Sequence, residues 1–238
     1  MEKSCQINEK IRIIALNGSP NRNRNTATLM KWVVNGFEAY EVDLEWINVA
    51  DLKLNYCKGC HTCLRTGSCA FKDDISNLID KIKTADGIIV GSPVYEGFPT
   101  AQLKTIMDRV ALLVLYTGLY EDKFSVGVAT SGIAPTKKVA KDIADIFGKK
   151  VGIMGVKTAS IAHGYQKLAE INSCKVKERA KKIGKKLIME CKKGPKKKSL
   201  KQRWIRFLRT KLMIKIIKKN PEQFSGVIDI WKDKGWWT

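Results

Sequence analysis

Short hydrophobic runs alternate with amphipathic segments along the first 170 residues of the chain. The runs are rich in β-branched residues and end in Gly, Ser or Thr turns, which is typical of strands buried on both faces of a parallel sheet. We therefore predict five strands, at residues 11–16, 43–49, 86–92, 124–131 and 152–161.

The segments between and after these runs have the apolar spacing of helices. We predict helices at residues 26–40, 73–85, 100–113, 135–150 and 168–191. Strands that alternate with helices predict an α/β protein, with a doubly wound five-stranded parallel sheet and helices on both faces. Ligands of such sheets bind beyond the carboxyl ends of the strands, so the residues that directly follow each strand are the candidates for function.

The positive charge of the chain is concentrated towards its C-terminal end. Residues 1–174 hold 22 Lys and Arg against 18 Asp and Glu, whereas residues 175–238 hold 22 against 5. The stretch KKGPKKKS breaks the helical pattern, because Gly and Pro disfavour a helix interior. We predict one domain over residues 1–192 and a basic, Trp-containing helical extension over residues 193–238.

The chain of 238 residues, 44% of them hydrophobic, can bury one substantial core. Its first residues, MEKSCQINEK, are polar, and apolar stretches such as ALLVLY are too short to span a bilayer. These features favour a cytoplasmic globular protein. In a reducing cytosol, clustered cysteines bind metal or carry out redox chemistry more often than they form disulfides.

The loop after the first strand, NGSPNRNRNTATLM, is rich in hydroxyl and amide groups. Asn25 is suited to cap the next helix, and Ser19, Asn25 and Thr26 would face a ligand at the positive end of that helix. The loop has neither the Walker pattern of a P-loop nor the G-x-G-x-x-G of a dinucleotide site. It is either a phosphate cradle or a polar turn with an ordinary cap.

Two further loops follow predicted strands. SPVYEGFPT combines two prolines and a glycine with Tyr95 and Phe98, which favours a rigid loop that can lie beside a flat ring. TSGIAP, after the fourth strand, is a turn of small residues that a planar ligand can approach closely. Together the three loops favour a mononucleotide with a large ring system, and a flavin fits best.

Three ordered motifs, NGSPNRNRNTATLM, CKGCHTCLRTGSCAFKDD and SPVYEGFPTAQLKTIMDR, resemble those of the NADPH-dependent FMN reductase family, and especially of its iron–sulfur flavoprotein branch. The resemblance covers about residues 11–165 and implies a flavodoxin-like fold. It implies that NGSPNRNRNTATLM binds the FMN phosphate, that SPVYEGFPT lies along the isoalloxazine ring and that TSGIAP closes the site. The FMN-binding residues so implied are Ser19, Asn21, Asn25, Thr26, Ala27, Pro93, Val94, Tyr95, Glu96, Gly97, Thr130, Ser131 and Gly132.

Four cysteines, Cys57, Cys60, Cys63 and Cys69, follow the spacing C-x2-C-x2-C-x5-C. Thiolates at x2 intervals can wrap a cuboidal iron–sulfur cluster, and a fourth nearby thiolate can complete its ligands. The run is similar to that of iron–sulfur flavoproteins, in which four cysteines bind one [4Fe–4S] cluster beside FMN.

Other interpretations of the cysteines are weaker. Structural zinc sites usually separate their cysteine pairs by a longer loop. Residues 57–61 also match the C-x-x-C-H signal of c-type haem attachment, but this leaves two cysteines unexplained and needs an exported chain. Flavin reductases with similar cysteines and no cluster remain an alternative, so the sequence leaves the metal content open.

The resemblance implies an FMN-dependent oxidoreductase, in which the protein positions the flavin and tunes its potential. Its electron donor would be NAD(P)H or a ferredoxin-like protein, and its acceptor a quinone, a second flavin or an oxygen species. Family members commonly form dimers or tetramers, which implies a homodimer or homotetramer.

The basic extension allows a second class of function. Its mixture of apolar and basic residues could lie on an anionic membrane surface or a phosphate backbone. We favour a terminal helix that packs on the domain or a sister subunit, anchored by Trp231, Trp236 and Trp237, because the apolar residues spread around the helix. The alternative is a flavodoxin-like binding or regulatory protein that uses this tail on nucleic acid or membrane.

Overall fold

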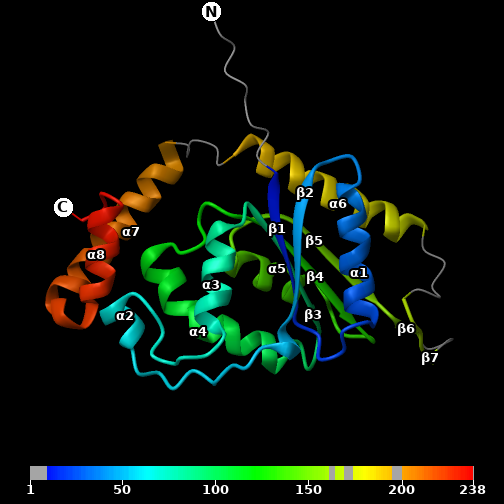
Figure 1. Ribbon diagram of the computed structural model, residues 1–238, viewed down its shortest axis with the longest axis horizontal. Helices are drawn as coiled ribbons and strands as arrows, with labels where there is room; N and C mark the ends of the chain where they lie inside the picture. The colour runs from blue at the N-terminus through cyan, green and yellow to red at the C-terminus, as the bar shows by residue number, and fades with distance from the viewer. Residues whose placement is uncertain (1–9, 161–163, 169–173, 195–199, 238) are drawn as a thin grey trace, which may run out of the picture.

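The computed structural model describes residues 10–160, 164–168, 174–194 and 200–237. Its centre is a five-stranded parallel sheet in the order β2-β1-β3-β4-β5 (Figure 1). This flavodoxin-like order confirms the predicted fold, and the strand order changes direction between β1 and β3. The strands are β1 (Ile11–Asn17), β2 (Val42–Asn48), β3 (Gly87–Pro93), β4 (Phe124–Ser131) and β5 (Lys149–Lys157).

Helices cover both faces of the sheet, as predicted, because successive residues of a strand point to opposite faces. Ile13 and Ala15 of β1 pack in one core with α1 and α6, whereas Ile14 and Leu16 pack in the other core with α3, α4 and α5. These helices are α1 (Asn25–Val34), α3 (Ile75–Thr84), α4 (Ala101–Thr117), α5 (Lys137–Ile146) and α6 (Cys174–Lys193), and a short 3-10 helix, η2 (Val49–Asp51), follows β2.

Two glycines let α6 lie directly against the end of α1. A Cβ atom at Gly184 would lie 1.9 Å from the carbonyl oxygen of Val33, and one at Gly36 would lie 2.3 Å from that of Lys181. Neither position can carry a side chain unless the helices move. The chain turns here through the 3-10 helix η1 (Asn35–Phe37), so the predicted helix over 26–40 ends early.

The end of the predicted fourth helix is instead part of a strand. α5 ends at Ile146 and β5 begins at Lys149, because Gly148 between them has a φ of +143°, which other residues rarely adopt. After β5, two short antiparallel strands follow, β6 (Ala159–Ser160) and β7 (Gly164–Tyr165). The last residue of the predicted fifth strand and residues 169–173 of the predicted last helix fall outside the described residues.

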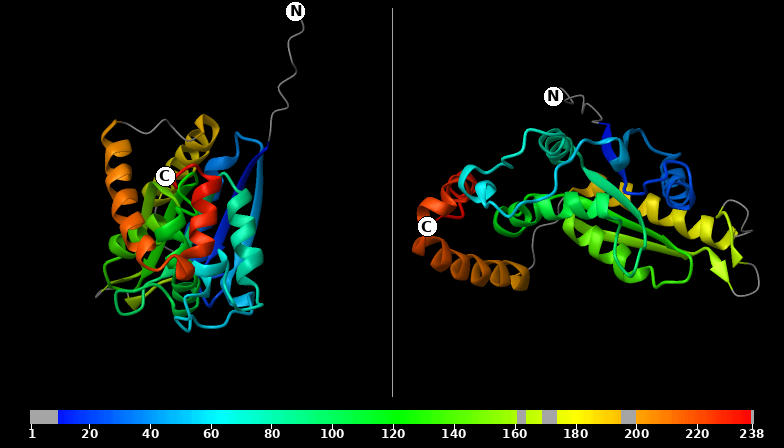
Figure 2. Two further views of the ribbon diagram at one scale, coloured as in Figure 1. Left: turned by 90° about the vertical axis from the view of Figure 1, so that its left-hand side faces the viewer. Right: turned by 90° about the horizontal axis from the view of Figure 1, so that it is seen from below.

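The C-terminal extension packs on the domain, as expected (Figures 1 and 2). Trp231 is buried, its Nε1 donates to the carbonyl oxygen of Tyr116 at 2.7 Å, and Trp236 and Trp237 pack against its ring. The three tryptophans therefore anchor the extension. Its helices, α7 (Leu200–Lys219), η3 (Pro221–Phe224) and α8 (Ser225–Asp233), form a third core with α4 and the short helix α2 (Thr62–Thr66).

A bilayer needs a helix of about 20 predominantly apolar residues to cross it. Among the described residues, none of the helices is long and apolar enough to do so.

Candidate functional site

One cavity lies at the carboxyl ends of the central strands, where the strand order changes direction. Its volume is about 380 Å³, which is within the range of sites that bind one small molecule. It is lined by residues at the carboxyl ends of β3 and β4 and by residues that follow β1, β3, β4 and β5: Ser19, Pro20, Asn21, Arg24, Asn25, Thr26, Pro93, Val94, Tyr95, Thr130, Ser131, Gly132 and Thr158.

The N-cap of α4 ties two of the lining loops together. Thr100 Oγ1 donates to the carbonyl oxygen of Gly18 at 2.6 Å and accepts from the N–H of Leu103 at 3.3 Å. The N–H of Gly18 donates to the carbonyl oxygen of Gly91 at 2.7 Å, and a Cβ atom at Gly18 would lie 2.8 Å from that of Leu103. Because Gly18 has no side chain, the loop after β1 can lie directly on β3 and α4.

Hydrogen bonds from side chains to the backbone shape the loop after β1. Asn17 Oδ1 accepts from the N–H of Ser19 at 3.2 Å, and Ser19 Oγ accepts from the N–H of Asn21 at 3.1 Å. Such local bonds stabilise tight turns. They hold Ser19 and Asn21 at the cavity wall, where both residues line it.

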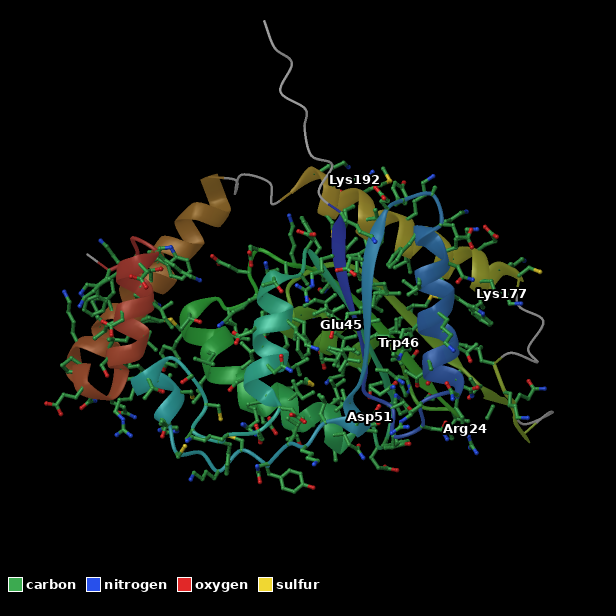
Figure 3. The ribbon with its side chains drawn as sticks, viewed as in Figure 1. Arg24, Glu45, Trp46, Asp51, Lys177 and Lys192 are labelled. Carbon is green, nitrogen blue, oxygen red and sulfur yellow. The ribbon has the colours of Figure 1, made fainter. Side chains whose placement is uncertain are left out.

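The first turn of α1 also faces this cavity. The N-cap residue is Arg24, which makes no side-chain cap hydrogen bond, and Figure 3 shows it at this end of α1. The prediction that Asn25 caps the helix is therefore wrong. The side-chain amide of Asn25 donates to the carbonyl oxygen of Gln166 at 3.2 Å, and Asn25 Oδ1 accepts from the N–H of Leu168 at 2.8 Å. The N–H groups and the dipole of this helix end suit an anion.

Two buried threonine hydroxyls meet at the cavity. Thr26 Oγ1 on α1 and Thr130 Oγ1 on β4 lie 2.7 Å apart, and each residue is only 3% exposed. In such a pair one hydroxyl donates to the other, which leaves the second hydroxyl with its own proton to donate. The pair can therefore offer a ligand a donor that is held in place by α1 and β4.

A tight turn after β3 presents Tyr95 at the cavity. The N–H of Tyr95 donates to the carbonyl oxygen of Phe98 at 3.0 Å, and the N–H of Phe98 donates back at 2.9 Å. Glu96 and Gly97 have φ values of +48° and +82°, the two positive values of a type I′ turn. Tyr95 remains 54% exposed, so its ring can pack on a planar ligand.

The structure brings most of the residues predicted to bind FMN to this one cavity, where Ser19, Asn21, Asn25, Thr26, Pro93, Val94, Tyr95, Thr130, Ser131 and Gly132 line it. Ala27 is instead buried within the packing of α1, and Glu96 and Gly97 form the tip of the turn outside the lining.

The lining residues Pro20, Arg24 and Thr158 were not among the predicted site residues. Thr158 directly follows β5, so the rule that ligands bind beyond the carboxyl ends of strands could have found it.

The chemistry of the cavity fits FMN. Arg24, the hydroxyl and amide side chains and the first turn of α1 suit a phosphate. Tyr95 and the small residues 130–132, at the end of β4, suit a flat ring that lies close to the backbone. The two halves of the cavity thus match the two ends of a flavin mononucleotide.

The four cysteines line a second, smaller cavity beside α4. Cys57 and Cys60 are exposed, whereas Cys63 and Cys69 are half-buried. His61 has a φ of +57° and is directly followed by α2, so part of the segment that carries the four cysteines, the cysteine loop (residues 57–69), is helical and Cys63 lies on that helix. The other residues around this cavity include Lys58, Phe71, Arg109 and Leu112.

A buried arginine links the cysteine cavity to the domain. Arg109 of α4 donates from Nε to the Sγ of Cys69 at 3.1 Å, and its terminal nitrogens donate to both carboxylate oxygens of Asp73 at 2.9 and 3.0 Å. It also donates to the carbonyl oxygen of Asn55 at 2.7 Å. Burial alone would raise the pKa of Asp73, but hydrogen bonds from Arg109 and Asn55 outweigh it and hold that pKa well below its usual range.

The thiols differ in acidity. Hydrogen bonds from Thr62 lower the pKa of Cys60. Burial, together with the neighbouring Cys69 and Cys60 thiols, raises the pKa of Cys63. Cys60 is therefore the thiol of this pair that more readily becomes the thiolate that metals bind.

Among the described residues, no group of three or more His, Cys, Asp and Glu side chains has an arrangement that could hold a metal ion. The cysteine cavity has a volume of about 30 Å³, close to the share of one water molecule in the liquid. Its chemistry nevertheless fits an iron–sulfur cluster, because four thiols line it and the Arg109 guanidinium lies beside them. The cysteine side chains would have to rearrange to hold a cluster.

α4 connects the two cavities. Its N-cap, Thr100, holds the loops of the larger cavity, and Arg109, in the third turn of the same helix, lines the cysteine cavity. At 1.5 Å per residue the two positions are roughly 13 Å apart along the axis. The helix α4 thus sets the distance between the two candidate sites.

The strand order and the cavity at its switch point define a flavodoxin-like protein with a site of mononucleotide size. Residues 11–167 match the NADPH-dependent FMN reductase family, and the chain belongs to this family.

The chain is similar to proteins described as iron–sulfur flavoproteins. One from Methanocaldococcus jannaschii is 42% identical over 99 residues, which cover 42% of this chain and about half, 51%, of that relative. One from Clostridioides difficile is 28% identical over 233 residues, which cover 94% of this chain and 98% of that relative. A solved structure of a flavone reductase has a TM-score of 0.56 at 19% identity, covering 76% of this chain and 63% of the other, which supports the fold.

Proposed function

We propose that the chain is an FMN-dependent oxidoreductase that accepts electrons from NAD(P)H. The observation that carries this proposal is the cavity at the β1–β3 switch point, where anion-binding groups and Tyr95 line one space in a chain of the FMN reductase family. FMN supplies the redox chemistry when it is bound, and the residues of the chain bind it, orient it and tune its potential.

In this proposal each loop contacts a different part of FMN. Residues 19–27 would hold the phosphate, residues 93–97 would lie along the ring, and residues 130–132 would close the site. Ala27, which is buried, would contribute its backbone N–H, whereas Glu96 and Gly97 would contribute the shape of the turn. Thr26 and Thr130 would supply the hydroxyl donor of their buried pair.

The proposal extends to the partners of the reaction. The cavity has the size for one mononucleotide, so a nicotinamide would stack transiently on the open side of the ring, near the exposed Tyr95. NAD(P)H or a ferredoxin-like protein is the proposed donor, and a quinone, a second flavin or an oxygen species the acceptor. We expect a cytoplasmic homodimer or homotetramer, which light scattering after gel filtration would measure.

We further propose that Cys57, Cys60, Cys63 and Cys69 hold one [4Fe–4S] cluster, which would transfer electrons singly. The four thiols line one cavity, and the similar proteins cited above are described as iron–sulfur flavoproteins. In this role Arg109 would orient Cys69 through its 3.1 Å hydrogen bond. A flavin reductase without a cluster, with structural or redox-active thiols, is the competing possibility.

The test of both proposals is the visible spectrum of protein purified without oxygen, with iron and acid-labile sulfide analysis. Flavin bands with about four irons per chain support both sites. Flavin bands without iron support the FMN site alone and contradict the cluster. Replacing Cys57 and Cys60 with serine should abolish iron binding, whereas Cys174→Ser, at an exposed cysteine of α6, should leave it unchanged.

The same preparation distinguishes the enzyme from the binding protein that the basic tail suggests. A protein that is colourless, does not take up added FMN and binds nucleic acid with a steep dependence on salt would contradict the oxidoreductase.

A further inference from the structure

α7 has apolar residues on two opposite sides. Ile217 is buried in the third core, with Met213 and Ile214 packed against that core. Among the described side chains of α7, three other apolar ones are exposed to water: Leu208 at 45%, Leu212 at 62% and Ile216 at 44%. They recur at every fourth residue, so they lie one above the other on the outer side of the helix.

Lysines share this outer side. At 100° per residue, Lys215 and Lys219 point within about 60° of Leu212, and both are exposed. The residues of α7 include no Asp or Glu, and the whole chain has a formal net charge of +21. We call the side formed by Leu208, Leu212, Ile216, Lys215 and Lys219 the outer face of α7.

The outer face lies at one end of the molecule. Figure 2 shows α7 and α8 together at this end, beyond α4, with β6 and β7 at the opposite end. The third core already fastens the helix to the domain through its inner side. The outer face can therefore meet a surface without any change in the fold.

We propose that the outer face of α7 docks on the surface of an anionic lipid bilayer. Apolar side chains of a surface helix enter the boundary between headgroups and acyl chains, and flanking lysines pair with anionic headgroups. Leu208, Leu212 and Ile216 would enter this boundary, and Lys215 and Lys219 would pair with the headgroups.

Charge and area favour a bilayer over other partners. A second copy in a two-fold dimer would set this face against itself and bring its lysines together. Among the described side chains of α7, the three exposed apolar ones are also few for a stable dimer, which buries about 800 Å² on each partner. A nucleic acid would attract the lysines but would give the exposed apolar side chains little to pack on.

Co-sedimentation of the intact protein with vesicles tests this inference. We expect binding to vesicles of phosphatidylcholine mixed with phosphatidylglycerol, little binding to phosphatidylcholine alone, and weaker binding at high salt. Leu212→Asp should weaken binding roughly tenfold or more, because it removes a leucine that the bilayer would bury. Lys215→Glu should weaken it about fivefold or more, because one lysine near the surface contributes about 1 kcal/mol.

Matched controls lie on α6. Met189→Asp changes another exposed apolar residue and Lys186→Glu another exposed lysine, and both should bind as the parent does. Equal losses in the α6 variants, or no binding to either kind of vesicle, would overturn the inference.

Two further outcomes would also overturn it. In the first, the protein does not bind vesicles but forms a dimer, and Leu212→Asp dissociates that dimer. In the second, the protein does not bind vesicles but binds nucleic acid, and Leu212→Asp leaves that binding unchanged. Ile216→Asp repeats the test at a second exposed position, and far-ultraviolet circular dichroism verifies the fold of each variant.

Discussion

Arg109 donates a hydrogen bond from Nε to the Sγ atom of Cys69 at 3.1 Å, while its terminal nitrogens bind the carboxylate of Asp73. The side chains of Arg109 and Asp73 are 0% and 6% exposed. Asn55 precedes the cysteines and Asp73 follows them, and both bind the same guanidinium. A buried ion pair therefore closes the base of the cysteine loop.

Replacing Asp73 with Asn should lower the free energy of unfolding by about 3–5 kcal/mol, because it leaves the buried Arg109 without its counter-charge. Urea unfolding of the metal-free protein measures this. The matched control is Asp108→Asn, which removes an exposed ion pair with Lys104 and should cost less than about 1 kcal/mol. Similar losses in the two variants would contradict a buried pair.

The same ion pair should make stability depend on pH. The pKa of Asp73 is lower in the folded than in the unfolded protein, so its contribution is complete above the unfolded pKa of about 3.9 and is lost as the pH falls through the folded pKa. The difference in unfolding free energy between the parent and Asp73→Asn should therefore shrink below about pH 4. A difference that stays constant in acid would show that Asp73 does not act through its charge.

Gly226→Ala should loosen the C-terminal helices from the cysteine loop. A Cβ atom at Gly226 would lie 2.3 Å from the backbone nitrogen of Gly67 and 2.6 Å from the carbonyl carbon of Thr66. We expect the free energy of unfolding to fall by about 1–3 kcal/mol in Gly226→Ala. This sign is opposite to that of helix propensity, because alanine normally stabilises a helix by about 1 kcal/mol relative to glycine.

Alkylation followed by mass spectrometry should show the effect of Gly226→Ala on Cys63, which is half-buried and packs against the third core. Its modification should become faster in the metal-free variant. Asp229→Ala, at an exposed position of the same helix, is the control and should leave the rate unchanged. An unchanged rate in Gly226→Ala would mean that α8 does not hold the loop.

Thr26→Val should weaken FMN binding by about one order of magnitude, because it removes one hydroxyl of the buried pair with Thr130. Quenching of flavin fluorescence on titration of the apoprotein measures the affinity. Thr117→Val also removes a buried hydroxyl, one that donates to the carbonyl oxygen of Leu113 at 2.6 Å on α4. This control should bind FMN as the parent does, and equal weakening would assign the effect to stability alone.

Tyr95→Ala should weaken FMN binding about fivefold and alter the absorption bands of the bound flavin, because its ring lines the cavity. Phe98→Ala is the control on the other side of the same turn. The ring of Phe98 does not line the cavity, and the hydrogen bonds of Phe98 to Tyr95 come from its backbone. If both variants changed the flavin spectrum equally, the packing of Tyr95 on the ring would be contradicted.

The sequence by itself determined the layered sheet and the position of the cavity at the β1–β3 switch point. Runs such as residues 11–16 and 124–131 are apolar on both faces, which a strand covered by helices on both sides requires. Because parallel strands present their carboxyl ends at one edge, the polar loops after β1, β3 and β4 had to meet. These inferences depend on neighbours along the chain, which the sequence displays directly.

Only the tertiary structure decided which distant residues meet. Asn25 binds the segment after β7 instead of capping its own helix, Arg109 reaches Cys69, and α8 lies on α2 at Gly67. Each contact joins residues that are far apart in sequence, and its geometry depends on how whole helices pack. The outer face of α7 could not be predicted from the sequence for the same reason. The apolar residues of that helix spread around it, and only packing shows that Ile217 is buried while Leu212 is exposed.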